Sequence, residues 1–146
     1  MPDTFSPTQP SYIGPRFEDA KVYDAMRVGV VTCRPETTLE DVGRMMVGYG
    51  IHSVVVTDLE GKGRLWGVVT SFDIARAAPD LNALAARDVA STDLATVDSD
   101  TPLQQAAQIM AERAINHLIA VQPGSDRPVG VISTRGIVAA LVYGQS

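Results

Sequence analysis

The sequence contains few of the residues on which many protein functions depend. Its 146 residues include one cysteine (Cys33), two histidines and only 5% aromatic residues. A single cysteine excludes an intramolecular disulfide and a multi-cysteine zinc or iron–sulfur site. The low aromatic content argues against a stacking platform for single-stranded nucleic acid. Basic residues are outnumbered too, since 12 Lys and Arg against 17 Asp and Glu leave a net charge of −5, which disfavours nucleic-acid and anionic-membrane partners.

The sequence also lacks the hydrophobic segments of membrane and exported proteins. No apolar run approaches the roughly 20 residues that a membrane span needs. Residues 1–15 contain neither the basic nor the apolar region of a signal peptide. We therefore expect a cytoplasmic protein with no membrane contact. Hydrophobic residues nevertheless make up 45% of the chain and charged residues 20%, a composition that builds one compact globular unit.

The first 20 residues differ in composition from the rest, with four prolines among Ser and Thr. We expect residues 1–20 to form a flexible arm, in which Tyr12, Ile13 and Phe17 are candidates for docking onto the rest of the chain.

From about Val22 the chain repeats itself. Thr32 and Thr96 lie 64 positions apart in matching contexts, and after a one-residue shorter loop Thr70 and Ser133 lie 63 apart. Order, spacing and residue class are kept throughout, which indicates two copies of one motif. A unit of this size buries only about 60% of its unfolded surface, so we expect the two copies to pack together.

Each copy is predicted to fold as β-α-β-β-α. The two matching sets of strands are expected over residues 28–33, 53–57 and 65–69, and over 94–97, 118–121 and 129–132. Capping boxes predict helix starts at Thr37-x-x-Glu40 and Thr101-x-x-Gln104. The last helix of each copy is expected to begin at Thr70 and at Ser133. The Ala-rich residues 80–86 are predicted to form a linker helix.

These repeated residues resemble the cystathionine-β-synthase (CBS) domain, which occurs in tandem pairs called Bateman modules. The resemblance is carried by the strand-Thr before each first helix, by the apolar strand after it, and by Gly-Val-Val-Thr-Ser-Phe-Asp-Ile at 67–74, weakened to Gly-Val-Ile-Ser-Thr-Arg-Gly-Ile at 130–137. It implies an α/β (α+β) fold with CBS motif 1 over residues 21–79 and CBS motif 2 over 87–143, packed with pseudo-twofold symmetry.

The resemblance implies a regulatory module and no enzyme activity. Family members commonly bind AMP, ADP, ATP or S-adenosylmethionine in clefts between the paired motifs, and two pairs often form a disc-like homodimer. A free-standing module would pass its signal to an effector protein. No covalent cofactor is implied, and the presence of magnesium is left open. The sequence itself contains no nucleophile elbow, Walker loop or zinc-ligand cluster that would indicate catalysis.

The family pattern also implies a set of ligand-binding positions, with a Thr-x-x-Asp at the last helix whose carboxylate holds the ribose hydroxyls. A carboxylate suits a vicinal diol because it accepts charge-assisted hydrogen bonds, and a helix N-terminus suits phosphate. Carried over to motif 1, the positions are Thr32, Cys33, Ile51, His52, Ser53, Thr70 and Asp73. In motif 2 they are Thr96, Asn116, His117, Leu118, Ser133 and Arg135.

Motif 2 departs from the pattern because Gly136 stands at the position of the ribose-binding Asp. Loss of a charge-assisted hydrogen bond costs about 1.5–3 kcal/mol, or roughly ten- to a hundredfold in affinity. We therefore expect one competent and one degenerate adenosine site, where Arg135 offsets part of the loss by meeting a phosphate.

Plainer interpretations remain open for these residues. Thr70 and Asp73 also fit an ordinary helix cap, and Cys33 fits a small buried hydrophobe. His52 and His117 without nearby carboxylates make a poor metal site, so no metal is expected. The alternative function, motivated by Gly136, is a structural or dimerisation module that has lost its ligand.

Overall fold

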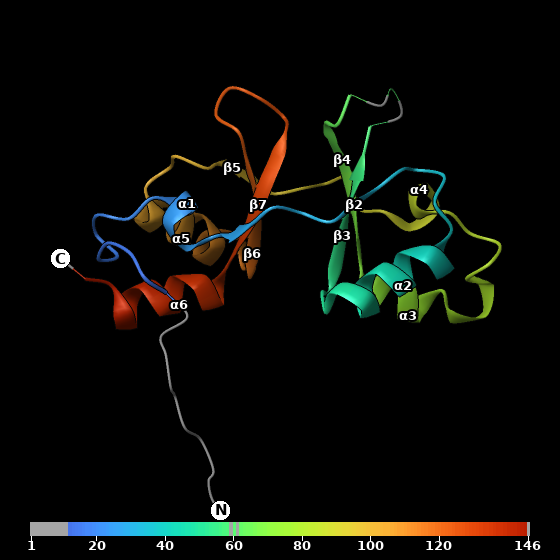
Figure 1. Cartoon of the computed structure of the whole chain (residues 1–146), viewed down its shortest axis with the longest axis horizontal. Helices are drawn as coiled ribbons and strands as arrows, with labels where there is room; N and C mark the ends of the chain where they lie inside the picture. The colour runs from blue at the N-terminus through green and yellow to red at the C-terminus, as the bar shows by residue number, and fades with distance from the viewer. Residues whose placement is uncertain (1–11, 59, 61, 146) are drawn as a thin grey trace, which may run out of the picture. The chain divides into compact units, whose positions relative to one another are not determined.

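The computed structural model describes residues 12–58, 60 and 62–145, which form two compact units (Figure 1). Unit 1 contains the described residues up to 28 together with residues 96–123 and from 130 onward. Unit 2 contains residues 29–95 and 124–129. Neither unit is a continuous stretch of sequence, so the boundaries of the two units differ from those of the two sequence repeats.

Unit 2 is built around a three-stranded sheet in the order β2-β3-β4. Strand β2 (Thr32–Cys33) runs parallel to β3 (Ser53–Thr57), which pairs antiparallel with β4 (Leu65–Thr70). The helices are α2 (Leu39–Tyr49), α3 (Ser71–Arg76) and α4 (Ala86–Val89), with a 3-10 turn at Ala78–Asp80.

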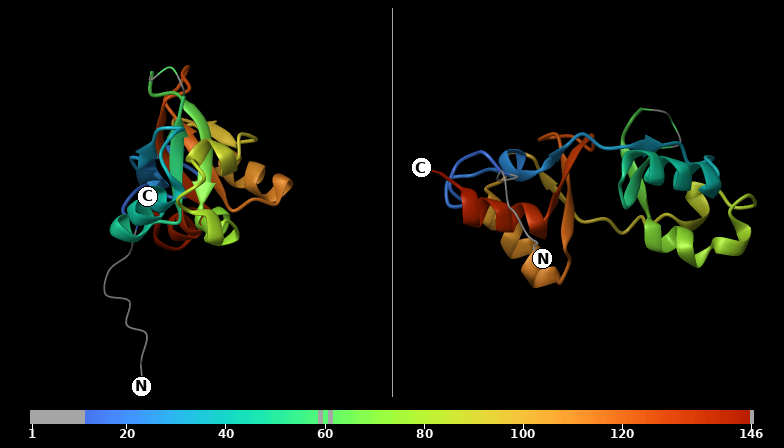
Figure 2. Two further views of the ribbon diagram at one scale, coloured as in Figure 1. Left: turned by 90° about the vertical axis from the view of Figure 1, so that its right-hand side faces the viewer. Right: turned by 60° about the horizontal axis from the view of Figure 1, so that its bottom comes forward.

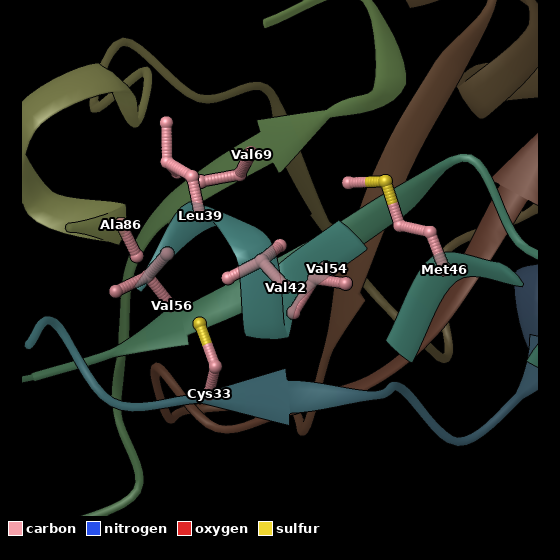
Figure 3. Packing of buried hydrophobic residues seen from close by; sticks show 8 residues of the cluster. All are labelled: Cys33, Leu39, Val42, Met46, Val54, Val56, Val69 and Ala86. Carbon is pink, nitrogen blue, oxygen red and sulfur yellow. The ribbon is translucent and has the colours of Figure 1, made fainter. Parts of the chain in front are cut away.

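The core of unit 2 forms where one face of α2 packs against the sheet (Figure 3). Leu39, Val42 and Met46 recur at helical spacing and are all buried. They meet a set of small apolar side chains from the strands and from α4, namely Cys33, Val54, Val56, Val69 and Ala86. Burial of each larger side chain contributes about 1.5–3 kcal/mol. Tyr49 continues this helical spacing but is 64% exposed, so it lies outside the core.

Unit 1 contains a four-stranded sheet in the order β1-β7-β6-β5. Strand β1 (Arg27–Val28) is antiparallel to β7 (Pro128–Ser133), and β5 (Thr96–Asp98) is parallel to β6 (His117–Val121). The helices are α1 (Val22–Ala25), α5 (Leu103–Arg113) and α6 (Thr134–Tyr143). Throughout the described part of the chain, every helix is too short or too polar to cross a membrane.

The residues just before α1 are packed onto unit 1. Tyr12 is only 4% exposed and its hydroxyl donates to the carbonyl of Pro15 at 2.6 Å. The N–H of Gln145 donates to the carbonyl of Gly14 at 3.1 Å, so this segment lies beside the end of α6, as the blue and red ribbons show (Figures 1 and 2). Tyr12 therefore docks, whereas Ile13 is 92% exposed. The rest of the predicted flexible arm, residues 1–11, lies outside the described residues.

The segment that leads each repeat belongs to the unit of the other repeat. We call residues 20–28 and 84–92 the leading segments. In unit 1, Arg27 pairs with Val131 of β7. In unit 2, Ser91 forms the corresponding bridge with Val68 of β4. Because both bridges join equivalent positions of the repeats, the exchange is a property of the repeated sequence.

This exchange explains why a single strand over residues 28–33 is a wrong prediction. Gly29 adopts a φ of +80°, which redirects the chain between β1 in unit 1 and β2 in unit 2. An apolar run does not reveal that its two halves pair with different sheets.

The leading segments also overturn the predicted linker helix at residues 80–86. Leu39 donates to the carbonyl of Leu84 at 3.0 Å, and Ala86 donates to that of Thr37 at 2.7 Å. These bonds hold the main chain extended at Ala85, so that only the short α4 follows. Equivalent bonds in unit 1 join the residues before α1 to the start of α5. Main-chain pairing thus outweighs the helix propensity of the alanines.

Both predicted capping boxes at the starts of α2 and α5 are wrong. Thr38, rather than Thr37, caps α2 by accepting from the N–H of Asp41 at 3.2 Å. The Thr37 hydroxyl instead accepts from the N–H of Arg34 and closes the preceding turn. Helix α5 begins after Pro102 with no side-chain cap.

Replacement of Gly130 by Ala is expected to destabilise the protein. An added Cβ would lie 2.6 Å from the carbonyl oxygen of Arg27 and 2.7 Å from the sulfur of Met26, where the leading segment crosses β7. We expect a loss of about 1–3 kcal/mol in the free energy of unfolding, measured in urea. The equivalent Gly67→Ala should cost less, because its nearest contacts are at 3.1 Å.

Gly48→Ala is the control, since nothing lies within 4 Å of its added Cβ on helix α2. It should raise stability by about 0.5–1 kcal/mol. Equal effects of Ala at positions 48 and 130 would contradict the proposed role of the crossing.

Candidate functional site

Thr70 and Asp73 meet where β4 ends and α3 begins. Thr70 is paired with Ser53 across the sheet and is also the N-cap of α3. The Asp73 carboxylate oxygen Oδ2 accepts from the Thr70 N–H at 2.8 Å and from its hydroxyl at 3.0 Å. The Thr70 hydroxyl in turn accepts from the Asp73 N–H at 3.3 Å. The pair is thus a reciprocal helix cap, as the plainer interpretation expects.

The second carboxylate oxygen of Asp73 is not used by this cap. Within the described residues, Oδ1 accepts no hydrogen bond, and its neighbour is Nη2 of Arg76 at 3.6 Å. The Asp73 side chain is 19% exposed, and its Oδ2 is held by Thr70. The geometry therefore provides a fixed carboxylate with one oxygen available to hydroxyl donors.

The helix end itself offers less to a phosphate than the sequence suggests. The N–H of Ser71 donates to the carbonyl of His52 at 2.8 Å, and that of Asp73 donates to Thr70. The Thr70 hydroxyl is also engaged with Asp73. Two of the N–H groups at this helix end are therefore already bonded within the protein, and α3 has only six residues.

The strand-end candidates Thr32 and Cys33 face opposite sides of β2. Thr32 is exposed, whereas Cys33 is 7% exposed and belongs to the core cluster (Figure 3). Burial raises the pKa of the Cys33 thiol, which keeps it neutral. Its carbonyl accepts from the Thr57 hydroxyl at 3.3 Å. Of the two side chains, only that of Thr32 is open to a ligand.

Two other candidates, Ile51 and His52, line a groove of about 880 Å³ along α2 and α3. Its walls are mainly apolar, and the Glu40–Arg44 ion pair stands among its lining residues. The other apolar lining residues are Met46, Val47, Ile74 and Leu81. Thr70 and Asp73 are not among its lining residues. The motif 1 candidates therefore lie in two places. Thr70 and Asp73 are at the end of β4, whereas Ile51 and His52 line the apolar groove.

Two exposed side chains at these places are not among the positions predicted from the sequence. Arg76 lies beside Asp73, and Val47 on the groove is 85% exposed. A charge three residues after Asp73 was a visible signal for the first. Val47 fits a helical apolar pattern, and only the fold shows that it faces outward.

Unit 1 has the same hydroxyl cap and main-chain hydrogen bond at the start of its last helix, but it lacks the carboxylate. Ser133 caps α6 by accepting from the Gly136 N–H at 3.2 Å. The carbonyl of Asn116 accepts from the Thr134 N–H at 3.0 Å, as that of His52 does from Ser71. The Asn116 side chain contacts Nδ1 of His117 at 2.9 Å.

The remaining motif 2 candidates are divided between surface and core. Thr96 and Arg135 are exposed, whereas the Leu118 side chain is fully buried. A ligand at Leu118 would therefore meet only its main chain.

Gly136 not only lacks the carboxylate of an Asp but also leaves room for a close main-chain contact. An added Cβ would lie 2.8 Å from the carbonyl oxygen of Ala25 and 3.1 Å from Cδ1 of Ile132. The end of α1 thus occupies the space that a side chain needs, and glycine permits this approach.

Metal-binding geometry is not found in the described part of the chain. It contains no group of three or more His, Cys, Asp or Glu side chains placed to hold an ion.

Several solved structures share the fold of this chain. An uncharacterized conserved protein from Pyrococcus horikoshii matches with a TM-score of 0.73 and 23% identity, covering 88% of this chain and 97% of that one. The CBS domain pair of protein MJ0100, solved in complex with 5′-methylthioadenosine and S-adenosyl-L-methionine, matches with a TM-score of 0.69 and 22% identity, covering 82% and 97%.

Among curated proteins, a homoserine O-acetyltransferase from Methanohalophilus mahii is 32% identical over 125 residues, 84% of this chain. The chain spans about a quarter of that enzyme's length. A model of the CBS domain family matches residues 22–80 and 86–143, the two sequence repeats. The chain therefore belongs to the CBS domain family and contains two CBS domains.

Proposed function

We propose that this protein is a regulatory module that binds an adenosine-containing ligand at Asp73 and relays its presence to a partner protein. The observation that carries the proposal is the Asp73 carboxylate, which is fixed through Oδ2 and has Oδ1 open to hydroxyl donors. The complex of a related CBS domain pair with 5′-methylthioadenosine and S-adenosyl-L-methionine supports the ligand class.

The geometry suits ribose because the carboxylate is already ordered. Two bonds from Thr70 hold Oδ2, so binding of a diol does not have to immobilise the side chain. A hydrogen bond to a charged group contributes about 1.5–3 kcal/mol. The same residue therefore serves as helix cap and as ligand acceptor.

We propose one such site per chain. At the equivalent place in unit 1, the carbonyl oxygen of Ala25 would lie only 2.8 Å from a Cβ on residue 136. A ribose there would have no carboxylate, so the degenerate second site follows from packing as well as from sequence.

Signalling requires that the ligand favours one arrangement of the protein over another. A ligand shifts an equilibrium only by its differential affinity for the two states. This proposal requires no catalytic residues. The sequence similarity to the acetyltransferase covers only a quarter of that enzyme. We therefore infer a regulatory rather than a catalytic role.

The groove on α2 and α3 favours a second function, self-association into a homodimer. Val47 exposes an apolar side chain at the groove, and Glu40 and Arg44 carry opposite charges beside it. In a twofold dimer each patch meets its own copy, so Glu40 of one chain can face Arg44 of the other. We propose a second copy of this chain as the occupant.

Ligand binding is tested by thermal unfolding with AMP, ADP, ATP, S-adenosylmethionine and a non-adenine control. A ligand at a hundred times its dissociation constant adds about 2.7 kcal/mol and raises the melting temperature by several degrees. Asp73→Asn keeps an oxygen for the Thr70 cap but replaces the other oxygen by an amide. It should therefore retain stability while weakening binding about tenfold or more.

Asp88→Ala is the matched control, because Asp88 caps α4 through the Ala85 N–H at 2.8 Å just as Asp73 caps α3. It should lower stability without changing ligand affinity. Unchanged affinity in Asp73→Asn would remove Asp73 from the site, and the absence of any ligand effect would favour the purely structural module.

Gly136→Asp restores the family residue in the second repeat but should not restore a site. We expect a loss of about 1–3 kcal/mol in unfolding free energy, since the side chain is forced against Ala25. Calorimetric titration should still give one ligand per chain. A stable variant that binds two ligands would contradict the packing argument.

Val47→Asp should weaken the proposed homodimer about tenfold or more, because it places a charge in an apolar contact. Sedimentation velocity over a range of concentrations measures this. Ile13→Asp, at a residue 92% exposed and outside the groove, should leave association unchanged. A wild-type chain that stays monomeric at every concentration would contradict the interface.

A further inference from the structure

Arg76 is held beside the proposed ligand-binding carboxylate. Its guanidinium lies 3.6 Å from Asp73 Oδ1 and 4.6 Å from the centre of the Phe72 ring. The Arg76 side chain is 68% exposed and Phe72 is 69% exposed. The cation is therefore positioned at the surface by a carboxylate on one side and an aromatic face on the other.

Fold stability gives little reason for this arrangement. An exposed ion pair three residues apart on a helix contributes little to stability, and at 3.6 Å it is longer than a hydrogen bond. Asp73 already fulfils its capping role through its other oxygen. The contact instead places a positive charge next to the one carboxylate oxygen left for a ligand.

The second repeat provides an internal comparison. At the positions of Phe72, Asp73 and Arg76 it carries Arg135, Gly136 and Ala139. Helix α6 nevertheless keeps its hydroxyl cap at Ser133. The carboxylate and the cation that follows it are thus absent together, although the helix start is preserved.

Arg76 also differs from Arg44 on α2. Arg44 contacts both Glu40 and Asp41, at 2.5 and 3.3 Å, so its charge is balanced by two carboxylates. Arg76 has Asp73 as its ion-pair partner among the described residues. When ribose hydroxyls occupy Oδ1, the guanidinium remains close by with its donors free for another anion.

We propose that Arg76 selects the charge of the adenosine ligand, an inference that rests on the proposed function. The 5′ substituent is attached to the same ribose whose hydroxyls Asp73 binds, within reach of a long arginine side chain. A guanidinium binds phosphate oxygens in a bidentate manner. It repels the positive sulfonium of S-adenosylmethionine. The preferred ligand class is therefore an adenosine 5′-phosphate.

The test is calorimetric titration of the full chain with AMP, adenosine and S-adenosylmethionine. Arg76→Gln should weaken AMP binding about tenfold while changing adenosine binding less than about twofold. Binding of S-adenosylmethionine should become tighter, because the repulsion of its sulfonium is removed. Arg113→Gln, which removes an exposed arginine at the end of α5, controls for the change in net charge and should alter none of the three affinities.

Each outcome distinguishes the inference from the proposed function. Equal weakening of AMP and adenosine would mean that Arg76 only positions Asp73, and unchanged AMP affinity would remove it from the site. Both results overturn charge selection while leaving the adenosine site in place. Failure of the wild-type chain to bind any of the three compounds would instead overturn the proposed function. Phe72→Leu keeps the charge and should give a smaller loss of AMP affinity than Arg76→Gln.

Discussion

The crossing of each leading segment over the sheet of the other repeat is the constraint on which both units depend. It requires the main chain to approach Gly67 and Gly130 so closely that a Cβ would meet neighbouring atoms at 3.1 Å or less. The same exchange supplies main-chain bonds to the starts of α2 and α5. Because a CBS motif of this size buries limited surface alone, completion by a segment from the other repeat adds contacts that its own sequence neighbours do not provide.

The exchange also produces the difference between the two candidate sites. Both units place a hydroxyl cap at the start of the last helix. The first N–H of that helix donates to the carbonyl of the residue just before β3 in unit 2, His52, or just before β6 in unit 1, Asn116. In unit 1 the end of α1 approaches so closely that residue 136 is glycine. In unit 2 the equivalent Asp73 has room for its carboxylate, which is partly exposed. The same strand-to-helix arrangement therefore accommodates a carboxylate at Asp73 but leaves no room for a side chain at Gly136.

Asp73 combines its helix-capping role with the ligand-binding role that we propose for it. Its two oxygens are chemically equivalent, but the fold gives them different surroundings, with Thr70 on Oδ2 and Arg76 near Oδ1. Helix capping fixes the carboxylate, and a fixed carboxylate loses less entropy on binding. The cap and the proposed site thus reinforce each other, so the sequence pattern Thr-x-x-Asp does not by itself distinguish them.

The sequence by itself determined the two repeats, the strands at Ser53–Thr57 and Leu65–Thr70, and the helix starts at Thr70 and Ser133. These depend on local periodicity and capping, which are encoded within a few residues. The tertiary structure alone decided the division of residues 28–33, the loss of the predicted helix at 80–86 and the closure at Gly136. Each of these depends on main-chain contacts between residues that are far apart in the sequence, and such contacts leave no local pattern to read.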